Sequence, residues 1–283
     1  MGLWDRRLQS AKQPKGLPVL GFWDRRLQSA KQPKGLPGSN RTPGTLSAPP
    51  VDNQPNSIKL PAQTIGGTGY PALMRYLDDS TYQQWLKTAR VLEQDGHGLK
   101  VLALADGSIV KLFRIKRLLT SQRLYPQAKR FARNAEKLQA LGISCPSVIA
   151  TWKLKTPPRN LVHYHPLPGE TLRDLRKRNP EQWHALLPAL GAFIAKLHDR
   201  GVYFRSLHLG NIVMTPEGTL GLIDIADMRF NRRRLSHNKR SRNLQHLLRY
   251  TEDWAETTCQ ELAEAYCNAS ANPKHITLFR CHP

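Results

Sequence analysis

Short segments in the middle of the chain alternate apolar and polar positions with a period of two, the pattern of half-buried strands. The strands predicted from this alternation cover residues 91–94, 99–105, 108–114, 147–155 and 161–167. Asp106-Gly107 supplies the tight turn between the second and third of these strands. A helix is predicted at 126–141, with Phe131 and Leu138 on its apolar face. Together these elements predict a small five-stranded antiparallel sheet with one helix.

After Pro168-Gly169 the pattern becomes mainly helical. Helices are predicted at residues 171–178, 181–200, 240–250 and 253–268, and two short strands at 211–215 and 220–225. The sequence therefore predicts an α+β protein of two lobes. The N-terminal lobe is expected at 74–167, and a mainly helical C-terminal lobe at 168–283.

The first 73 residues have a different character. Residues 2–18 recur as residues 21–37 with a single difference, Leu3 against Phe22, which indicates a recent duplication of a 17-residue segment. A Pro/Ser/Asn/Gly-rich linker follows. We expect residues 1–73 to be a disordered tail. Met74 opens a segment that resembles a natural protein start, so Met1 and Met74 both stay open as the start of translation.

The net charge of the chain favours some classes of binding partner over others. The net charge is +22, of which residues 1–73 contribute +7 and the remainder +15. A basic protein favours polyanionic partners: phosphorylated substrates, an anionic membrane surface or nucleic acid. Nucleic acid is the least favoured, because no recognisable nucleic-acid motif or interleaved aromatic pattern is present.

The chain has neither a membrane-length apolar window nor a secretory signal. These features predict a cytoplasmic protein, with peripheral contact at the inner face of the inner membrane as a further option, and four reduced cysteines.

One segment carries the strongest chemical signal. LHDRGVYFRSLHLGNIVM, followed after a hairpin by GLIDIAD, resembles the catalytic and metal-binding segments of protein kinases. Asn211 stands where kinases have a metal-binding asparagine, and Asp224 where they have the aspartate of DFG. The resemblance implies that both residues hold Mg²⁺ bridging the phosphates of ATP. Taken singly, Asn211 could be a turn residue and Asp224 a helix cap.

Lys111, in SIVKLF, stands where kinases place the strand lysine that pairs with ATP. A lysine on a strand is often a solvated edge residue, but Val110 and Leu112 are apolar, which favours a lysine that points into a cleft. Glu136 lies on the following helix and is expected to be its partner, because a buried charge needs one.

The chain also departs from the kinase pattern. Ser206 occupies the position of the catalytic aspartate, and its hydroxyl is a very weak base. His208 is a candidate substitute base, although a structural role is the favoured alternative. The loop expected to cover the ATP phosphates, with Gly96 and Gly98, is shorter than the usual G-x-G-x-x-G.

Within kinase-like proteins the chain most resembles bacterial lipopolysaccharide kinases, which phosphorylate inner-core sugars such as heptose or Kdo. Among these it is closest to relatives called toluene tolerance proteins. The residues that carry this resemblance are EQDGHGLKVL, VKLFRIKRLL, LVHYHPLPGETLRDL, YFRSLHLGNIV and GLIDIADMRF.

A basic run follows Asp224, where a kinase places its substrate-facing segment. It contains Arg229, Arg232, Arg233, Arg234, Lys239, Arg240 and Arg242. Such a cluster suits an anionic sugar or glycolipid, while a merely solvated basic loop is an equal alternative. Two functions therefore stay open. One is an ATP/Mg-dependent phosphotransferase that is slow because of Ser206, and the other is a nucleotide-binding pseudokinase that acts as a regulatory or envelope-stress module.

Overall fold

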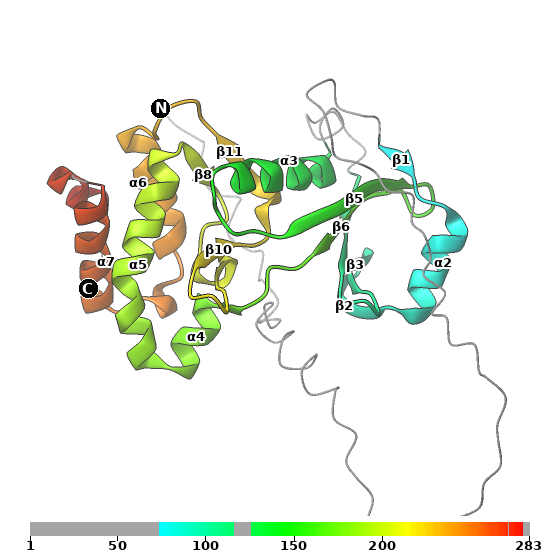
Figure 1. Cartoon of the computed structure of the whole chain (residues 1–283), viewed down its shortest axis with the longest axis horizontal. Coiled ribbons are helices and arrows are strands. Elements are labelled where there is room, and N and C mark those ends of the chain that lie inside the picture. The colour runs from blue at the N-terminus through cyan, green and yellow to red at the C-terminus, as the bar shows by residue number, and fades with distance from the viewer. Residues whose placement is uncertain (1–73, 116–125, 271, 280–283) are drawn as a thin grey trace, which may run out of the picture.

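The computed structural model describes residues 74–115, 126–270 and 272–279, which form two lobes (Figure 1). The predicted tail at 1–73 lies outside the described residues, and so does the choice between Met1 and Met74. The strands of the N-terminal lobe are β1 (Arg75–Tyr76), β2 (Arg90–Asp95), β3 (Gly98–Ala103), β4 (Ile109–Arg114), β5 (Ser147–Leu154) and β6 (Arg159–His165). Its helices are α2 (Asp79–Thr88) and α3 (Gln127–Ala140).

The N-terminal lobe is built on one sheet, with strand order β1-β5-β6-β4-β3-β2. All five predicted strands are present and antiparallel, so the predicted two-lobed α+β, protein-kinase-like architecture is confirmed. The predicted strand number is wrong by one, because β1 adds a parallel edge strand to β5 through Arg75 and Tyr76. A two-residue strand is too short to show a period in the sequence. The predicted single helix of this lobe is also wrong, because α2 precedes the sheet and packs on it.

Alternation along β4 assigns its residues to two faces of the sheet. Val110 and Leu112 belong to a core cluster that α2 covers with Tyr82 and Trp85. Ile109 and Phe113 belong instead to the main cluster, which contains the buried face of α3 and continues into the C-terminal lobe. Successive side chains on a strand point to opposite faces. The residue between Val110 and Leu112 therefore faces the junction of the lobes.

The C-terminal lobe is mainly helical, as predicted. Its helices are α4 (Leu172–Arg178), α5 (Pro180–Asp199), α6 (His237–Leu248) and α7 (Glu256–Ala269), with 3₁₀ segments at Leu209–Asn211, Ile225–Asp227, Thr251–Asp253 and Pro273–Leu278. Thr171 caps α4, as the sequence predicts, by accepting a hydrogen bond from Asp174 N. At Gly191 of α5 an added Cβ would lie 2.6 Å from Ala265 Cβ of α7. Only glycine lets the two helices approach this closely.

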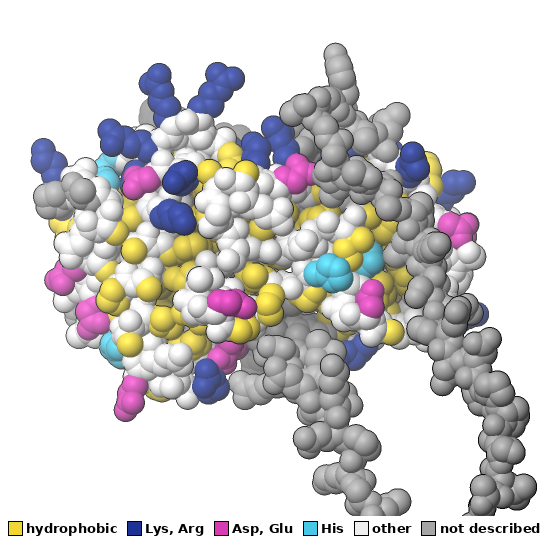
Figure 2. Space-filling view, viewed as in Figure 1, with side chains coloured by type: hydrophobic (Ala, Val, Ile, Leu, Met, Phe, Trp, Pro, Cys, Tyr) yellow, Lys and Arg dark blue, Asp and Glu magenta, His cyan; other side chains and the backbone are white. Residues whose placement is uncertain are grey.

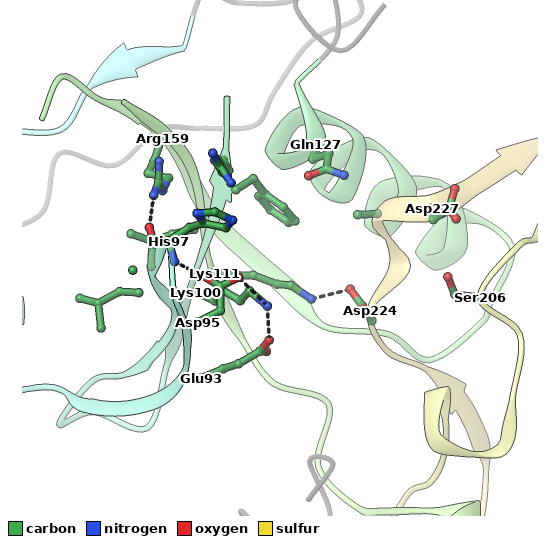
Figure 3. A pocket seen from close by; sticks show the side chains of 16 residues that line it. Glu93, Asp95, His97, Lys100, Lys111, Gln127, Arg159, Ser206, Asp224 and Asp227 are labelled. Carbon is green, nitrogen blue, oxygen red and sulfur yellow. Dashed lines mark hydrogen bonds and ion pairs between the residues drawn. The ribbon is translucent and has the colours of Figure 1, made fainter. Parts of the chain in front are cut away.

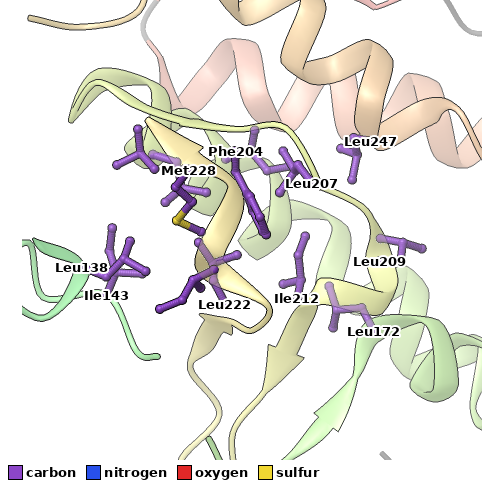
Figure 4. Packing of buried hydrophobic residues seen from close by; sticks show 14 of the residues in the cluster. Leu138, Ile143, Leu172, Phe204, Leu207, Leu209, Ile212, Leu222, Met228 and Leu247 are labelled. Atoms are coloured by element: carbon purple, nitrogen blue, oxygen red, sulfur yellow. The ribbon is translucent and has the colours of Figure 1, made fainter. Parts of the chain in front are cut away.

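Five very short strands position the loops between the helices. They are β7 (Glu170–Thr171), β8 (Val202–Phe204), β9 (Ile212–Met214), β10 (Leu220–Leu222) and β11 (Met228–Phe230). β9 pairs with β7 and β10, and β8 pairs with β11. Beneath them Phe204, Leu207 and Ile212 are fully buried and pack with Leu222 and Met228 (Figure 4). Burial of each such side chain stabilises the fold by about 1.5–3 kcal/mol, so this packing holds the loops in place.

Two further features are the lengths of the apolar helices and the state of the cysteines. Among the described residues, no helix combines the length and apolarity needed to cross a membrane. Cys145 and Cys267 are free thiols, as predicted. Cys259 is disulfide-bonded, so the prediction of four reduced cysteines is wrong for this residue.

Candidate active site

A cavity of about 360 Å³ opens between the sheet and the loops of the C-terminal lobe (Figure 3). Its lining from the N-terminal lobe includes Glu93, Asp95, His97, Gly98, Lys100, Lys111, Phe113, Arg114 and Arg159. From the C-terminal lobe it includes Ser206, Asp224, Ala226 and Asp227. The cavity therefore joins residues that lie more than 100 positions apart in the sequence.

Lys111 and Asp224 meet at the centre of this cavity. Lys111 Nζ lies 2.5 Å from Asp224 Oδ1, and the two side chains are 22% and 46% exposed. The lysine points across the cleft because it shares the inner face of β4 with Phe113, whose ring centroid is 5.9 Å from Nζ. The expected position of Lys111 is thus the observed one, but its partner is Asp224.

The expected ion pair between Lys111 and Glu136 is not formed. Glu136 is exposed on α3, and no ion pair of Glu136 is recorded within the described part of the chain. The face of α3 that packs inward carries Phe131 and Asn134 instead. Asn134 is buried and donates from Nδ2 to the Ile225 carbonyl at 2.7 Å. Sequence reasoning missed this residue, although it lies one helical turn from Phe131.

The backbone aims the Asp224 carboxylate into the cavity. Asp224 lies between β10 and a 3₁₀ turn with φ 51° and ψ 45°, and among described non-glycine residues it alone has a positive φ. This left-handed conformation costs about 1–2 kcal/mol for an L-residue, so its surroundings must impose it. Ile223 N donates to the Asn211 carbonyl at 3.1 Å, and the Asn134 bond holds Ile225 on the other side.

Ser206 lies in a tight turn after β8, and Asn211 ends the 3₁₀ segment that follows it. Leu207 N donates to the Phe204 carbonyl at 3.1 Å, and the Asn211 side-chain amide donates to the Ser206 carbonyl at 2.8 Å. Asn211 is only 6% exposed and does not line the cavity, whereas Ser206 does. The structure thus brings Ser206 to the cavity that Asp224 lines, and the Asn211 side chain holds the Ser206 backbone from outside the cavity.

His208 lies away from the cavity, in contact with a buried ion pair. Arg173 forms a bidentate ion pair with Asp253, whose side chain is 1% exposed. The His208 ring meets Tyr250 edge to face at 5.3 Å, and His208 Nδ1 is buried without a hydrogen-bond partner among the described residues. Burial, with a smaller contribution from Arg173, lowers the pKa of His208 to about 4. The imidazole is therefore neutral at pH 7 and a poor proton acceptor.

The predicted phosphate-covering loop is the two-residue turn of the β2–β3 hairpin. Gly98, with φ 106°, lines the cavity, whereas Gly96 does not. His97 N donates to Asp95 Oδ1 at 2.8 Å, and the His97 carbonyl accepts from Arg159 Nη2 at 2.6 Å. The turn thus satisfies its own polar groups, and Arg159 is a cavity residue that the sequence did not reveal.

Asp227 is a second carboxylate that the C-terminal lobe contributes to the cavity, and sequence reasoning missed it. Its oxygens lie 3.7 Å from Arg205 Nε and 3.8 Å from Arg130 Nη2. Arg130 belongs to α3, and Arg205 precedes Ser206 in the turn after β8. Asp227 therefore links the helix of one lobe to the candidate catalytic turn of the other.

The predicted basic cluster divides into exposed and buried residues. Arg232, Arg233 and Arg234 are exposed on the segment between β11 and α6 and do not line the cavity. Figure 2 shows Lys and Arg side chains gathered along this upper edge of the C-terminal lobe. Arg240 is 3% exposed and donates to Tyr266 Oη at 2.8 Å. Its place in a substrate-facing cluster is therefore a wrong expectation.

The donor set at the cleft suits a hard divalent cation. Asp224 offers a carboxylate oxygen that Lys111 does not occupy, and the Asn211 amide oxygen accepts no hydrogen bond from the described residues. Magnesium takes oxygen ligands and commonly uses one or two protein groups together with substrate phosphates. No group of three or more His, Cys, Asp or Glu residues suited to a metal occurs in the described ranges. Asp224 therefore fits the role of a magnesium ligand in the cavity, whereas Asn211, which is 6% exposed and does not line the cavity, stays a predicted second ligand.

Comparison with known proteins agrees with the family resemblance. The model of the lipopolysaccharide kinase (Kdo/WaaP) family matches residues 169–266, which contain Ser206, Asn211 and Asp224. The predicted resemblance to lipopolysaccharide kinases is thereby confirmed, while the closer likeness to toluene tolerance proteins stays a prediction. No curated protein matches the chain.

Several solved structures are similar to the chain. One is a complex of WbdD with the kinase inhibitor LY294002, at 14% identity and a TM-score of 0.40, covering 61% of this chain and 43% of that one. Monomeric WbdD matches at 18% identity and a TM-score of 0.35, covering 49% and 33%. A divergent Toxoplasma kinase lacking the glycine-rich loop matches at 13% identity and a TM-score of 0.38, covering 72% of this chain and 76% of that one. The chain thus spans less than half the length of the WbdD chains.

Proposed function

We propose that this protein is an ATP- and magnesium-dependent phosphotransferase of the lipopolysaccharide-kinase type, acting slowly on an anionic core sugar or glycolipid. The observation that carries the proposal is the 2.5 Å contact of Lys111 with Asp224 in a cavity that also contains Ser206. A strand lysine and a carboxylate that meet in a cleft between two lobes form the nucleotide site of kinase-like proteins.

In this proposal Lys111 leaves Asp224 when nucleotide enters and pairs with its phosphates. Asp224 and Asn211 would hold magnesium, which neutralises charge on the phosphates when bound. The acceptor hydroxyl forms a bond to the terminal phosphorus while the bond from that phosphorus to ADP breaks. Positioning and electrostatics account for most of the catalysis in such transfers, so the reaction survives a weak base.

Ser206 sets the expected rate. A carboxylate at this position would orient the acceptor hydroxyl or take its proton, which is worth about 10²–10⁴ in rate. The Ser206 hydroxyl is neutral and can only donate or accept a hydrogen bond, so the proton must pass to water or to the transferred phosphoryl group. His208 is no substitute in this account, because it lies outside the cavity lining and its pKa is lowered to about 4. We assign it to packing against Tyr250.

The exposed positive charge of the C-terminal lobe supports the proposed acceptor and location. The exposed arginines Arg232, Arg233 and Arg234 lie beyond Asp224 along the chain, and guanidinium groups pair well with phosphates and carboxylates. This favours an anionic sugar or lipid headgroup, and a cytoplasmic protein in peripheral contact with the inner membrane.

Ser206 also favours a second candidate, a pseudokinase that binds nucleotide and acts as a regulatory or envelope-stress module. A transfer assay on the full chain separates the two. Phosphate transfer from ATP to lipopolysaccharide core sugar is measured for the unchanged protein, Ser206→Asp, the matched control Ser206→Ala, and Asp224→Ala.

For the enzyme we expect slow, magnesium-dependent transfer that Asp224→Ala abolishes and Ser206→Asp accelerates, by at most about 10²–10⁴. Nucleotide binding without transfer, with transfer gained only in Ser206→Asp, would favour the pseudokinase. Neither binding nor transfer in any of the four proteins would refute both candidates.

A further inference from the structure

Strands β3 and β4 separate before they reach the hairpin tip. Their last ladder pair is Val101 with Lys111, whereas β4 and β6 stay paired as far as Arg114 with Arg159. Residues on both sides of the resulting gap line the cavity, among them Leu99 of β3 and Arg114 of β4. The cavity therefore extends from Lys111 through this gap to a second cationic end, formed by Arg114 and Arg159, which lie on the opposite face of the sheet from Lys111.

These two arginines lie directly opposite each other in the ladder, an arrangement that is destabilising for like charges. No ion pair joins Arg114 or Arg159 to a carboxylate within the described part of the chain. The hydrogen bonds of the Arg159 guanidinium go to neutral carbonyls, of His97 at 2.6 Å and of Pro158 at 3.1 Å. The positive charge at this end of the cavity is therefore not neutralised by the protein.

The other cations of the cavity are neutralised. Lys100 Nζ lies 2.9 Å from Glu93 and 3.2 Å from Asp95. Lys111 is held by Asp224 at 2.5 Å. An anion that enters the cavity thus finds uncompensated charge at the arginine end.

The hairpin tip above this end is poorly suited to phosphate. Loops that cradle phosphates do so with free backbone N–H groups. Here the N–H of His97 is already taken by Asp95 at 2.8 Å, and the Asp95 carboxylate itself repels an anion. Some other group must therefore hold the outer phosphates of a nucleotide.

We propose that Arg114 and Arg159 form a phosphate-binding pair that takes over the role of the glycine-rich loop. The pair binds the outermost phosphate of the nucleotide, while Lys111 binds the phosphate nearer to Asp224. This inference rests on the proposed function, since it assumes that the cavity holds a nucleoside triphosphate. Arg159 also fixes the hairpin tip through His97, so binding and loop position depend on one side chain.

The test uses titration calorimetry on the full chain with Mg-ATP, Mg-ADP, AMP and pyrophosphate. The variants are Arg159→Gln, which keeps an amide donor for the His97 carbonyl, and Arg114→Gln, which breaks no recorded hydrogen bond. Lys177→Gln is the charge-matched control, because Lys177 is exposed on α4 and does not line the cavity.

We expect each arginine variant to weaken Mg-ATP binding by about tenfold to a hundredfold, the effect of one charge-assisted hydrogen bond. AMP binding should change little in either variant, and Lys177→Gln should behave as the unchanged protein. Unchanged Mg-ATP affinity in both arginine variants, or equal losses for AMP and ATP, would overturn the inference.

The outcome for the unchanged protein separates the two proposals. Pyrophosphate binding that depends on the arginines, without nucleotide binding, would refute the proposed function and keep the anion site. Binding of neither pyrophosphate nor nucleotide would refute both.

Discussion

The substitution Asn134→Leu tests which residue of α3 holds the Asp224 segment in place. Asn134 is 6% exposed, and its amide donates to the Ile225 carbonyl at 2.7 Å. Ile225 is itself fully buried, so water cannot replace the lost donor. Leaving a buried carbonyl without a partner costs about 1–3 kcal/mol. Leucine is similar in size and buries more apolar surface, which offsets part of this cost. We therefore expect the free energy of unfolding to fall by about 1–3 kcal/mol.

The measurement is urea unfolding of the full chain, with Glu136→Gln as the matched control on the same helix. Glu136 is exposed and has no recorded ion pair, so its replacement should change the free energy of unfolding by less than about 0.5 kcal/mol. Asn134→Leu should also weaken Mg-ATP binding, because Ile225 follows Asp224. A larger loss for Glu136→Gln than for Asn134→Leu would refute the reasoning and restore the glutamate to the role that the sequence suggested.

Three further predictions concern separate parts of the molecule. Lys111→Met should weaken Mg-ATP binding by about tenfold or more in calorimetry. The same substitution should lower the free energy of unfolding in urea by less than about 1 kcal/mol, because the partner Asp224 is 46% exposed and can be solvated. A larger decrease would show that the ion pair is structural. Gly191→Ala should destabilise by about 1–3 kcal/mol, because the new methyl group overlaps Ala265 of α7; an unchanged melting temperature would contradict this close packing. Burial lowers the pKa of His198 to about 3, so the unfolded chain takes up a proton that the folded one refuses. His198 therefore leaves the free energy of unfolding unchanged above pH ~6.5. Below this pH it lowers the free energy of unfolding by up to about 1.4 kcal/mol per pH unit. The pKa values of His163 and His208 are also lowered by burial, to about 4, so they add to this slope between pH 7.5 and 5. His198→Gln should therefore reduce the slope by up to about 1.4 kcal/mol per pH unit, and an unchanged slope would contradict the assignment.

The sequence predicted the elements of the fold well where their period was long enough to read. All five predicted strands of the N-terminal lobe and the long helices of the C-terminal lobe are present within a few residues. The helix α2 was missed, and so were the strands β1, β7, β8 and β11, which have only two or three residues each. The existence of these strands depends on pairing with distant segments rather than on a local pattern.

At the site, the sequence identified positions better than partners. The kinase-like spacing correctly predicted that Asp224 lies at the cleft, whereas Asn211 is buried next to the cavity and does not line it. The choice of Glu136 rested on its residue type and neglected its helical face. Asn134 and Phe131 share the buried face of α3, while Glu136 is displaced from it. Position on a helix face decides which side chain can reach the cleft, so the periodicity already contained this information.

Charge patterns were the least informative signal. Arg240 falls in a basic run, yet it is buried, while its neighbours Arg232, Arg233 and Arg234 are exposed. Arg159 gave no signal, because its contact with His97 spans 62 residues of sequence and crosses the splayed end of the sheet. Only the three-dimensional arrangement shows which cations are neutralised and which can receive an anion.

The proposed function requires that Lys111 and Asp224 define one magnesium–nucleotide site between the lobes. Calorimetric titration of the full chain with ATP, with and without magnesium, tests it most directly. We expect one ATP to bind per chain, with an affinity that depends on magnesium and is lost in Asp224→Ala. Absence of ATP binding to the unchanged protein, or equal binding by Asp224→Ala, would contradict it.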